Sequence, residues 1–416
     1  MNWFDLIKYL FVFQTFALVL IERKRLTLNP AIIYLVFNGI VGIGCFKYFQ
    51  EDVVADYKHA AIIGVSPLLI YIGYLLAISK ANFSNSYYIF WNKPLIESSQ
   101  KRKKRLLYLL IFSIAMSILY YQLVGYNLFL ESLRGGANDF VQMRLDAYSG
   151  KNYYAPGIFN QFKNTIFPIL FVYFAFLWRN RNFFWYYIVI VGLILVFSLI
   201  GTGQRTFLVT GILIIIAIIT GLKSGKISKS IVFYSSIFII VVFGFLSLQL
   251  NRVSDAGLTS TLEQLSHRIF DSNQLSAVVG FRYVEKQNIV LGNEWLESLI
   301  GLVPGIKGSD LSNRIFDQIF GGFRGTAPLS VWGSAYHNFG FMGSIFLCLL
   351  VGFLYTKVYL RFINGKKTII RVTVYCSIFV YLFTWIAGAP SQLLINGLLG
   401  CGLLLLFQRK KESRVS

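Results

Sequence analysis

Long apolar stretches recur along the whole chain and limit its fold more than any other feature. A helix needs about 20 mostly apolar residues to cross a membrane, and eleven stretches of the 416-residue sequence approach that length. They lie at 3–21, 29–49, 60–79, 106–130, 164–178, 183–201, 206–222, 230–248, 328–356, 369–388 and 391–407. Charged residues make up only 14% of the chain, against about 25% in a soluble domain. We therefore expect an all-α polytopic membrane protein, a bundle of about 11 transmembrane helices.

The distribution of Lys and Arg predicts the orientation of these spans. One set of connections holds 23 basic and 3 acidic residues: 22–27, 80–105, 179–182, 223–229, 361–371 and 409–414. The other set holds 13 basic and 14 acidic residues: 50–59, 131–163, 202–205 and 249–327. Basic connections stay on the cytoplasmic side, so the N-terminus is expected outside and the C-terminus inside. The net charge of +21 then indicates orientation and contact with anionic membrane lipids, and nucleic-acid binding is not expected.

Two outside connections are long enough to carry function. The loops at 131–163 and 249–327 have 33 and 79 residues, and loops much longer than about 15 residues are usually functional. We therefore divide the chain into transmembrane helices 1–8 at 1–248, a partly helical lid loop at 249–327, and transmembrane helices 9–11 at 328–416.

Two helices are predicted inside the lid loop. Ser260-x-x-Glu263 is a capping box that opens an apolar face of Leu262, Leu265 and Ile269. Asp310 can cap a second helix at 311–320, which Gly321-Gly322 would end. The apolar face of this second helix comprises Leu311, Ile315 and Ile319. Such faces are expected to lie on the bundle or at the membrane interface.

Arginines on the outside loops are the main chemical signal, because topology disfavours them there. A guanidinium grips phosphate oxygens in pairs and stays charged. Arg205 is the principal candidate: it follows two glycines in Gly201-Thr-Gly-Gln-Arg205-Thr, whose backbone amides we expect to be free for an anion. The other substrate-binding candidates are Arg282, Arg314, Arg324, Arg268 and Arg144. The alternative is that ordinary ion pairs with the acidic residues of these loops absorb most of the arginines.

His337 is the candidate general base. It stands in Trp332-Gly-Ser-Ala-Tyr-His337-Asn338-Phe-Gly-Phe-Met-Gly343, near the outer end of the ninth span. An imidazole near neutral pKa can accept a hydroxyl proton. The equally weighted alternative is a structural histidine that donates a hydrogen bond to a neighbouring span.

The sequence favours chemistry without a cofactor. No Gly-rich loop ending in Gly-Lys-Ser/Thr occurs, which argues against an ATP-driven pump. Glu51, Asp52 and Asp56 form an acidic cluster, but a divalent cation needs several well-placed oxygens, and an interface cluster is the preferred interpretation. The four cysteines fall inside predicted spans and are interpreted as packing residues. We expect neither a metal nor another cofactor.

The layout resembles the bacterial oligosaccharide repeat-unit polymerases, the Wzy-type O-antigen polymerases. The resemblance rests on the span count with one dominant outside loop and on two short motifs. Thr202-Gly-Gln-Arg205-Thr resembles the family's Gly-Ser-Arg turn between spans. Tyr336-His-Asn-Phe-Gly340-Phe-Met-Gly343 resembles its Tyr-x-Asn-Phe-Gly-x-x-Gly opening of a late span. The His337-Asn338 pair is also similar to the related O-antigen ligases, and Asn338 joins the substrate-binding candidates.

The resemblance implies a substrate, a reaction and a location. The substrate would be undecaprenyl pyrophosphate carrying an oligosaccharide, and a glycosyltransferase at the periplasmic face of the inner membrane would polymerise these units in lipopolysaccharide biosynthesis. Arg205 would neutralise the pyrophosphate and His337 would take the acceptor proton. A chain-length regulator in the membrane is a further expected partner.

Three other functions remain open at this point. A flippase or transporter of the same lipid-linked unit would have similar size and charge, although it would not need the 79-residue loop. An O-antigen ligase would use the same donor with the lipid A core as acceptor. A metal-dependent glycosyltransferase would use the acidic cluster at 51–56.

Overall fold

The described part of the chain is helical. The computed structural model describes residues 2–23, 28–78, 83–134, 140–149, 154–178, 185–203, 205–223, 273–322 and 325–408, with single residues between 230 and 271. Within these ranges the only extended pairings are isolated bridges, Ile96 with Thr368 and Ser330 with Ala387. Four helices among the described residues are long and apolar enough to cross a membrane: α1 (Trp3–Ile21), α3 (Val54–Ile78), α5 (Gln100–Val124) and α17 (Val331–Ile363). The described part of the chain is therefore all-helical and compatible with a helical membrane protein, as expected.

Shorter apolar helices account for most of the other predicted spans. They are α2 (Pro30–Cys45), α9 (Phe167–Trp178), α10 (Trp185–Ile200), α11 (Arg205–Lys223), α18 (Ile369–Phe383) and α20 (Leu399–Gln408). The stretch at 230–248 lies largely outside the described residues. The connection at 80–105 also contains an aromatic-rich helix that was not predicted, α4 (Phe83–Asn92). The count of eleven spans stays a prediction.

Several predicted boundaries are wrong where charged residues lie next to an apolar stretch. α3 begins at Val54, so part of the connection at 50–59 is helical. α5 begins at Gln100 and takes the basic run 101–105 into its first turns; it ends at Val124, before Gly125 at φ +84°. Long charged side chains extend away from a helix toward water, so apolar content alone does not mark where a helix begins.

The chain divides into two compact units that are both discontinuous in sequence. Unit 1 comprises residues 1–90, 263–365 and 382–393, and unit 2 comprises 91–262, 366–381 and 394–416. Unit 1 contains α1, α2, α3 and α17 with three helices of the large loop: α14 (Asn273–Glu285), α15 (Asn293–Ile300) and α16 (Leu311–Phe320). The predicted boundaries near 248 and 327 divide the sequence, whereas the compact units combine segments from both sides of them.

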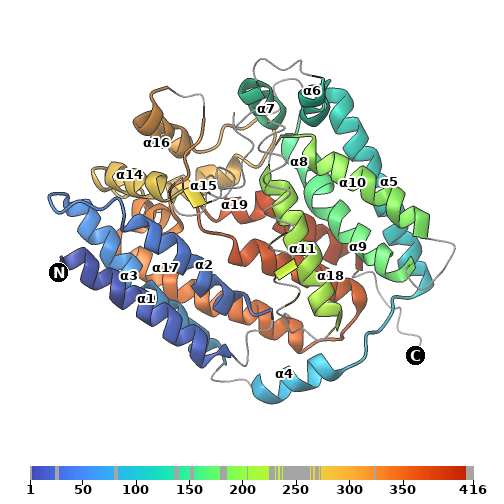
Figure 1. Ribbon diagram of the computed structural model, residues 1–416, viewed down its shortest axis with the longest axis horizontal. Helices are drawn as coiled ribbons and strands as arrows, with labels where there is room; N and C mark the ends of the chain where they lie inside the picture. The colour runs from blue at the N-terminus through green and yellow to red at the C-terminus, as the bar shows by residue number, and fades with distance from the viewer. Residues whose placement is uncertain are drawn as a thin grey trace. The chain divides into compact units, whose positions relative to one another are not determined.

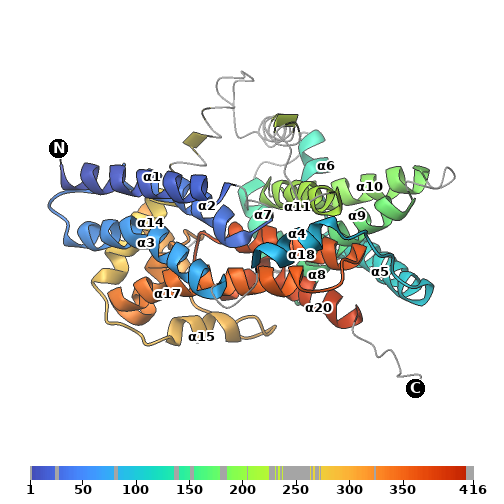
Figure 2. The ribbon, with the colours of Figure 1, turned by 90° about the horizontal axis from the view of Figure 1, so that it is seen from below.

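The core of unit 1 is the crossing of α3 and α17, which lie side by side in Figures 1 and 2. Gly73 and Gly352 face the opposite helix so closely that a Cβ on either would overlap a backbone carbonyl, of Leu349 or Ile70 respectively. Small residues allow such close approach of helices. Buried hydrogen bonds of Asn38 join α2 to both helices. Trp332 Nε1 on α17 donates to Asn38 Oδ1 at 2.9 Å, and Asn38 Nδ2 donates to Ser66 Oγ on α3 at 2.7 Å.

Unit 2 contains two π-helical turns that pack on each other, η2 (Phe162–Ile166) and η5 (Leu394–Leu398). Gln161 joins them: its Nε2 donates to the carbonyl oxygens of Leu394 and Ile395, and its Oε1 accepts from Gly400 N at 2.8 Å. Lys163, a residue of η2, is fully buried, with its Nζ 4.6 Å from the centre of the Tyr120 ring. Irregular helix is tolerated at membrane depth where protein groups take up the freed backbone bonds.

Candidate functional site

Within unit 1, the described part of the large loop packs on α3 through α14. Arg282 on α14 holds Asp56 on α3 with both arms of its guanidinium, Nε to Oδ1 at 2.9 Å and Nη2 to Oδ2 at 2.6 Å. The same Nη2 donates to the carbonyl oxygen of Tyr48 at 2.8 Å, and the Asp56 side chain is only 1% exposed. Arg282, predicted as a substrate ligand, is therefore engaged with a buried carboxylate, and its geometry favours the ion-pair alternative.

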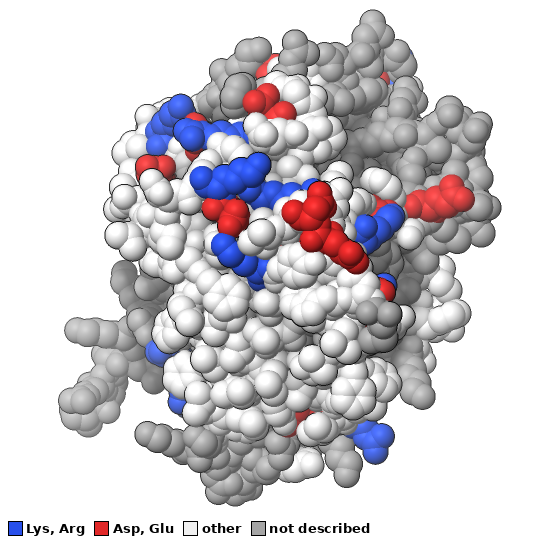
Figure 3. Space-filling view, turned by 90° about the vertical axis from the view of Figure 1, so that its left-hand side faces the viewer, with Lys and Arg blue, Asp and Glu red and all other residues white. Residues whose placement is uncertain are grey.

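Two further ion pairs fasten the same loop to the α2–α3 region. Lys58 Nζ lies 2.7 Å from Glu285 Oε1, and Lys47 Nζ lies 2.6 Å from Asp271 Oδ1. The hydrogen bond with Lys47 lowers the pKa of Asp271 and raises the pKa of Lys47. Figure 3 shows charged side chains of both signs interleaved in a band on this face, next to a broad uncharged surface. Ionic contacts therefore hold the loop in place at several points.

The predicted helix at 311–320 is confirmed as α16, and Gly321 and Gly322 follow it at positive φ. Its predicted apolar face packs in a cluster with Val284 and Leu329. The predicted cap is wrong in detail: the Asp310 side chain accepts no amide hydrogen bond, and Ser309 Oγ accepts from Leu311 N at 3.3 Å. Asp310 instead forms an ion pair with Arg314, in which Arg314 Nε lies 3.0 Å from Asp310 Oδ1.

His337 lies in the first turns of α17, just before a break in that helix. Gly340 has φ +70° and ψ −167° inside the helix, a conformation that favours glycine. His337 is buried, 6% exposed, and its backbone oxygen accepts from Val290 N at 3.1 Å. Its Nδ1 has no hydrogen-bond partner among the described residues. The alternative expectation, that the histidine donates a hydrogen bond to a neighbouring span, is therefore not met by Nδ1 among the described residues.

Asn338 locks α15 onto α17. Its Nδ2 donates to Glu294 Oε2 at 3.0 Å and to the carbonyl oxygen of Ser334 at 2.9 Å, while its Oδ1 accepts from Trp295 N at 3.3 Å. Trp295 Nε1 also donates to Ser334 Oγ at 2.9 Å, and Glu294 accepts from Ser298. Asn338, predicted to bind substrate, is thus fully engaged in holding the loop.

The electrostatic neighbours of His337 come from two loop helices. Glu294 on α15 and Arg314 on α16 both act on its imidazole. Arg314 is half exposed, and its hydrogen bonds to Asp310 and Tyr283 raise its pKa. Arg314 of the predicted site and Glu294, which was not predicted, are therefore within electrostatic reach of His337, and Glu294 binds the neighbouring Asn338 directly.

Arg205 begins α11 in unit 2, and its side chain lies outside the described set. The preceding turn is well defined, with Gly203 at φ +66°. Our expectation that its glycine amides are free for an anion is wrong: Gly201 N donates to Phe197 O at 3.1 Å, and Gly203 N donates to Ile200 O at 2.9 Å. The last turn of α10 supplies carbonyl groups that need partners, and these amides satisfy them.

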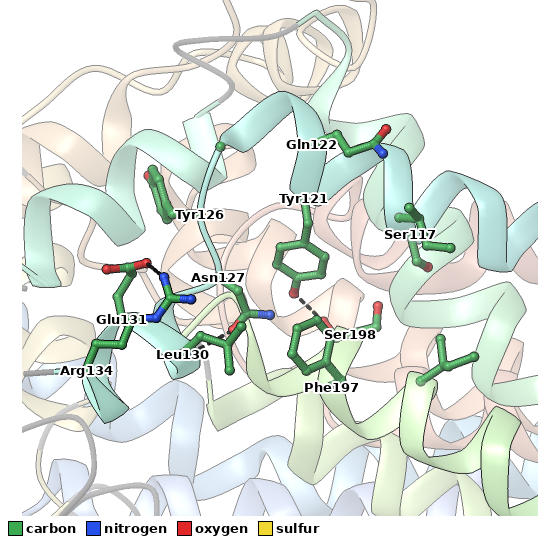
Figure 4. A pocket seen from close by; sticks show the side chains of 13 residues that line it. Ser117, Tyr121, Gln122, Tyr126, Asn127, Leu130, Glu131, Arg134, Phe197 and Ser198 are labelled. Atoms are coloured by element: carbon green, nitrogen blue, oxygen red, sulfur yellow. Dashed lines mark hydrogen bonds and ion pairs between the residues drawn. The ribbon is translucent and has the colours of Figure 1, made fainter. Parts of the chain in front are cut away.

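A pocket of about 380 Å³ lies beside this turn, between α5, α6 (Leu128–Leu133) and α10 (Figure 4). Leu128 N donates to Gly201 O at 2.8 Å and joins the turn to α6. Tyr121 OH donates to the carbonyl oxygen of Ser198 at 2.6 Å across the pocket wall. Arg134, on the rim, pairs with Glu131 at 3.4 Å. The turn that precedes Arg205 therefore lies next to a cavity that its sequence did not indicate.

The remaining predicted residues stay untested. Arg144 is half-buried on α7 (Phe140–Ser149), and Arg268 and Arg324 lie outside the described residues, as does most of the predicted capping-box helix. Among the described residues no cluster of His, Cys, Asp or Glu is arranged to hold a metal. The four cysteines are free and buried, in agreement with a packing role.

Two signals pointed weakly to the residues that were missed. Gly125-Tyr-Asn127 is a helix stop followed by a cap, which marks the start of α6. Leu291-Gly-Asn-Glu294 similarly covers the start of a short helix, α15, but no local pattern relates Glu294 to His337, 43 positions later in the sequence. Comparison of the chain with family models, curated proteins and solved structures gives no match.

Proposed function

We propose that this protein polymerises undecaprenyl-pyrophosphate-linked O-antigen repeat units at the periplasmic face of the bacterial inner membrane, in lipopolysaccharide biosynthesis. The observation that carries the proposal is His337: a buried imidazole whose Nδ1 has no partner among the described residues, near an arginine and a glutamate, under helices of the large loop. In this proposal the chain crosses the membrane eleven times, with a periplasmic N-terminus and a cytoplasmic C-terminus.

The reaction makes one glycosidic bond and breaks one bond to phosphate. A hydroxyl oxygen of the acceptor sugar attacks C1 of the donor glycan, and its proton passes to His337. The bond between C1 and the pyrophosphate oxygen breaks, and the electron pair leaves with the prenyl pyrophosphate. The Glu294 carboxylate is one of the charges that act on the imidazole, and the half-exposed Arg314 offsets the charge that develops on the leaving group. Arg205 belongs to the other unit and stays a predicted pyrophosphate ligand.

The folded loop favours a transferase over a flippase. Two loop helices are fastened to the bundle, α14 to α3 by ion pairs and α15 to α17 by the Asn338 network, an arrangement suited to fixing catalytic groups. An O-antigen ligase would need the same histidine and arginine chemistry. The acceptor therefore distinguishes the two enzymes, and a genetic experiment can identify it.

Deletion of the gene in its host tests the proposal directly. Loss of a polymerase leaves the lipid A core carrying a single repeat unit on a lipopolysaccharide gel, and the wild-type gene restores the long ladder. Loss of a ligase or a flippase leaves bare core, and that pattern would contradict the proposed function.

A further inference from the structure

The pocket in unit 2 contains two buried polar groups that lack partners. Asn127 is 6% exposed and Ser198 is 2% exposed, and both line the pocket (Figure 4). Asn127 Nδ2 and Ser198 Oγ make no hydrogen bond to any residue that the structure describes. A buried polar group without a partner costs about 1–3 kcal/mol, and such groups are rare in native proteins. Their presence at one cavity indicates a ligand.

The orientation of the Asn127 amide is fixed by the helix that it caps. Its Oδ1 accepts from Phe129 N at 3.1 Å and from Leu130 N at 3.3 Å, at the start of α6. Because the oxygen is committed to these amides, the NH₂ group faces the other way, toward Gly201 and Tyr121 (Figure 4). An amide flip would lose both cap bonds. Asn127 therefore has a buried donor without a partner among the described residues beside the pocket.

The unpartnered groups of the pocket favour a ligand with acceptor oxygens. Arg134 and Glu131 on the rim balance each other. The groups without partners are an amide NH₂ and a hydroxyl, which can both donate. The oxygens of a phosphate can accept from both donors.

The rest of the lining is apolar. Ile118 on α5 and Ile194 and Phe197 on α10 line the pocket along apolar helices of unit 2. A polar end and an apolar wall together suit an amphipathic molecule. A free phosphate ion would leave this wall without a partner.

We propose that the pocket between α5, α6 and α10 binds the phosphate of a membrane lipid, with Asn127 and Ser198 donating to phosphate oxygens and the lipid chain lying along Ile118, Ile194 and Phe197. The phosphate can belong to a prenyl phosphate or to an ordinary phospholipid. This proposal concerns binding and does not require the proposed reaction.

Native mass spectrometry of the full-length protein, released from detergent, tests it with four probes. These are undecaprenyl phosphate, phosphatidylglycerol, undecaprenol and inorganic phosphate. We expect one of the two lipid phosphates to bind and the other two probes not to bind. Preference for the prenyl phosphate would make the pocket a substrate site, and preference for phosphatidylglycerol would make it a structural lipid site. Absence of binding by both lipid phosphates, or equal binding of undecaprenol and undecaprenyl phosphate, would overturn the proposal.

Two variants locate the site. Asn127→Asp keeps the oxygen that caps α6 and removes the donor, and Ser198→Ala removes the hydroxyl. We expect Asn127→Asp to weaken lipid-phosphate binding by about tenfold or more and Ser198→Ala by about threefold. Ser113→Ala is the matched control, because Ser113 is buried on α5 outside the pocket and its hydroxyl donates within its own helix.

The opposite result is also well defined. If the pocket is only a structural void, Ser198→Ala removes an unsatisfied group, so it raises stability and leaves lipid binding unchanged. Unchanged binding in folded Asn127→Asp and Ser198→Ala would overturn the proposal. Because binding is measured without turnover, absence of glycan synthesis by the wild type would contradict the proposed function and leave this result intact.

Discussion

Asn338 in unit 1 and Asn127 in unit 2 are the same residue type in opposite situations. Both are buried, but every polar atom of the Asn338 amide is bonded to protein. Asn127 bonds through its oxygen only, and its nitrogen has no partner among the described residues. A satisfied amide stabilises a structure, whereas an unsatisfied one beside a cavity is available to a ligand. The hydrogen bonds of the Asn338 amide are therefore complete, whereas the Asn127 amide beside the Arg205 turn keeps a donor without a partner among the described residues.

The sharpest test of this contrast is the same substitution at both positions. Asn338→Asp places a second carboxylate against Glu294 in a buried network, and we expect it to lower the free energy of unfolding by about 3–5 kcal/mol. Asn127→Asp keeps its cap bonds and is expected to change stability by about 1 kcal/mol or less. Thermal unfolding of the purified variants measures both. Equal losses would remove the distinction between the two asparagines.

Arg282→Ala tests whether the loop is held by a buried ion pair. It leaves the Asp56 carboxylate, 1% exposed, without its main partner, and a loss of about 3 kcal/mol is expected. Adding Asp56→Asn should recover much of that loss, because no charge is then left buried. A stable single variant would favour the original expectation that Arg282 serves a substrate.

Gly201→Ala tests the tight packing beside the pocket. A Cβ at Gly201 would overlap the Asn127 amide and the Tyr121 hydroxyl, so we expect a cost of about 1–3 kcal/mol and weaker lipid-phosphate binding. Gly402→Ala is the control, because its Cβ meets nothing within 4 Å, and a helical Gly→Ala change is neutral or favourable by up to about 1 kcal/mol. Equal behaviour of the two variants would contradict the described geometry.

Asp271→Asn tests the outermost fastening of the loop, and its effect should be the smallest. The pKa of Asp271 is lowered from 3.8, so the stability from this pair is present above pH 3.8 and is lost as the pH falls through the lowered value. The pKa of Lys47 is raised from 10.5, so the stability is also lost as the pH rises through that raised value. Hydrogen exchange at neutral pH should show slightly faster exchange in the first turn of α14. Exchange as fast as in Arg282→Ala would contradict this order.

Much of the fold follows from properties that are local in sequence. Apolar stretches predicted helices, as α1 at 3–21 shows. The period of apolar residues, together with Gly321-Gly322, predicted α16 at 311–320. The helix starts at Val54 and Gln100 were not predicted, because charged residues were counted as loop although a helix can carry them at its ends.

The site was less predictable because its contacts join distant residues. The motif that contains His337 and Asn338 was recognised, but Glu294 meets Asn338 only after α15 folds against α17. The composition of the loops showed 14 acidic residues and predicted ion pairs in general, without showing that Asp56 would engage Arg282. No local pattern reveals the pocket at Asn127, because a cavity forms only where three helices meet.

Polymerisation can be measured on purified protein reconstituted with lipid-linked repeat units as the only substrate. A polymerase that depends on His337 makes a ladder of longer glycans and releases one prenyl pyrophosphate for each unit added, and folded His337→Ala produces neither. Wild-type protein that extends no chains, or His337→Ala protein that extends them at the wild-type rate, would contradict the proposed function.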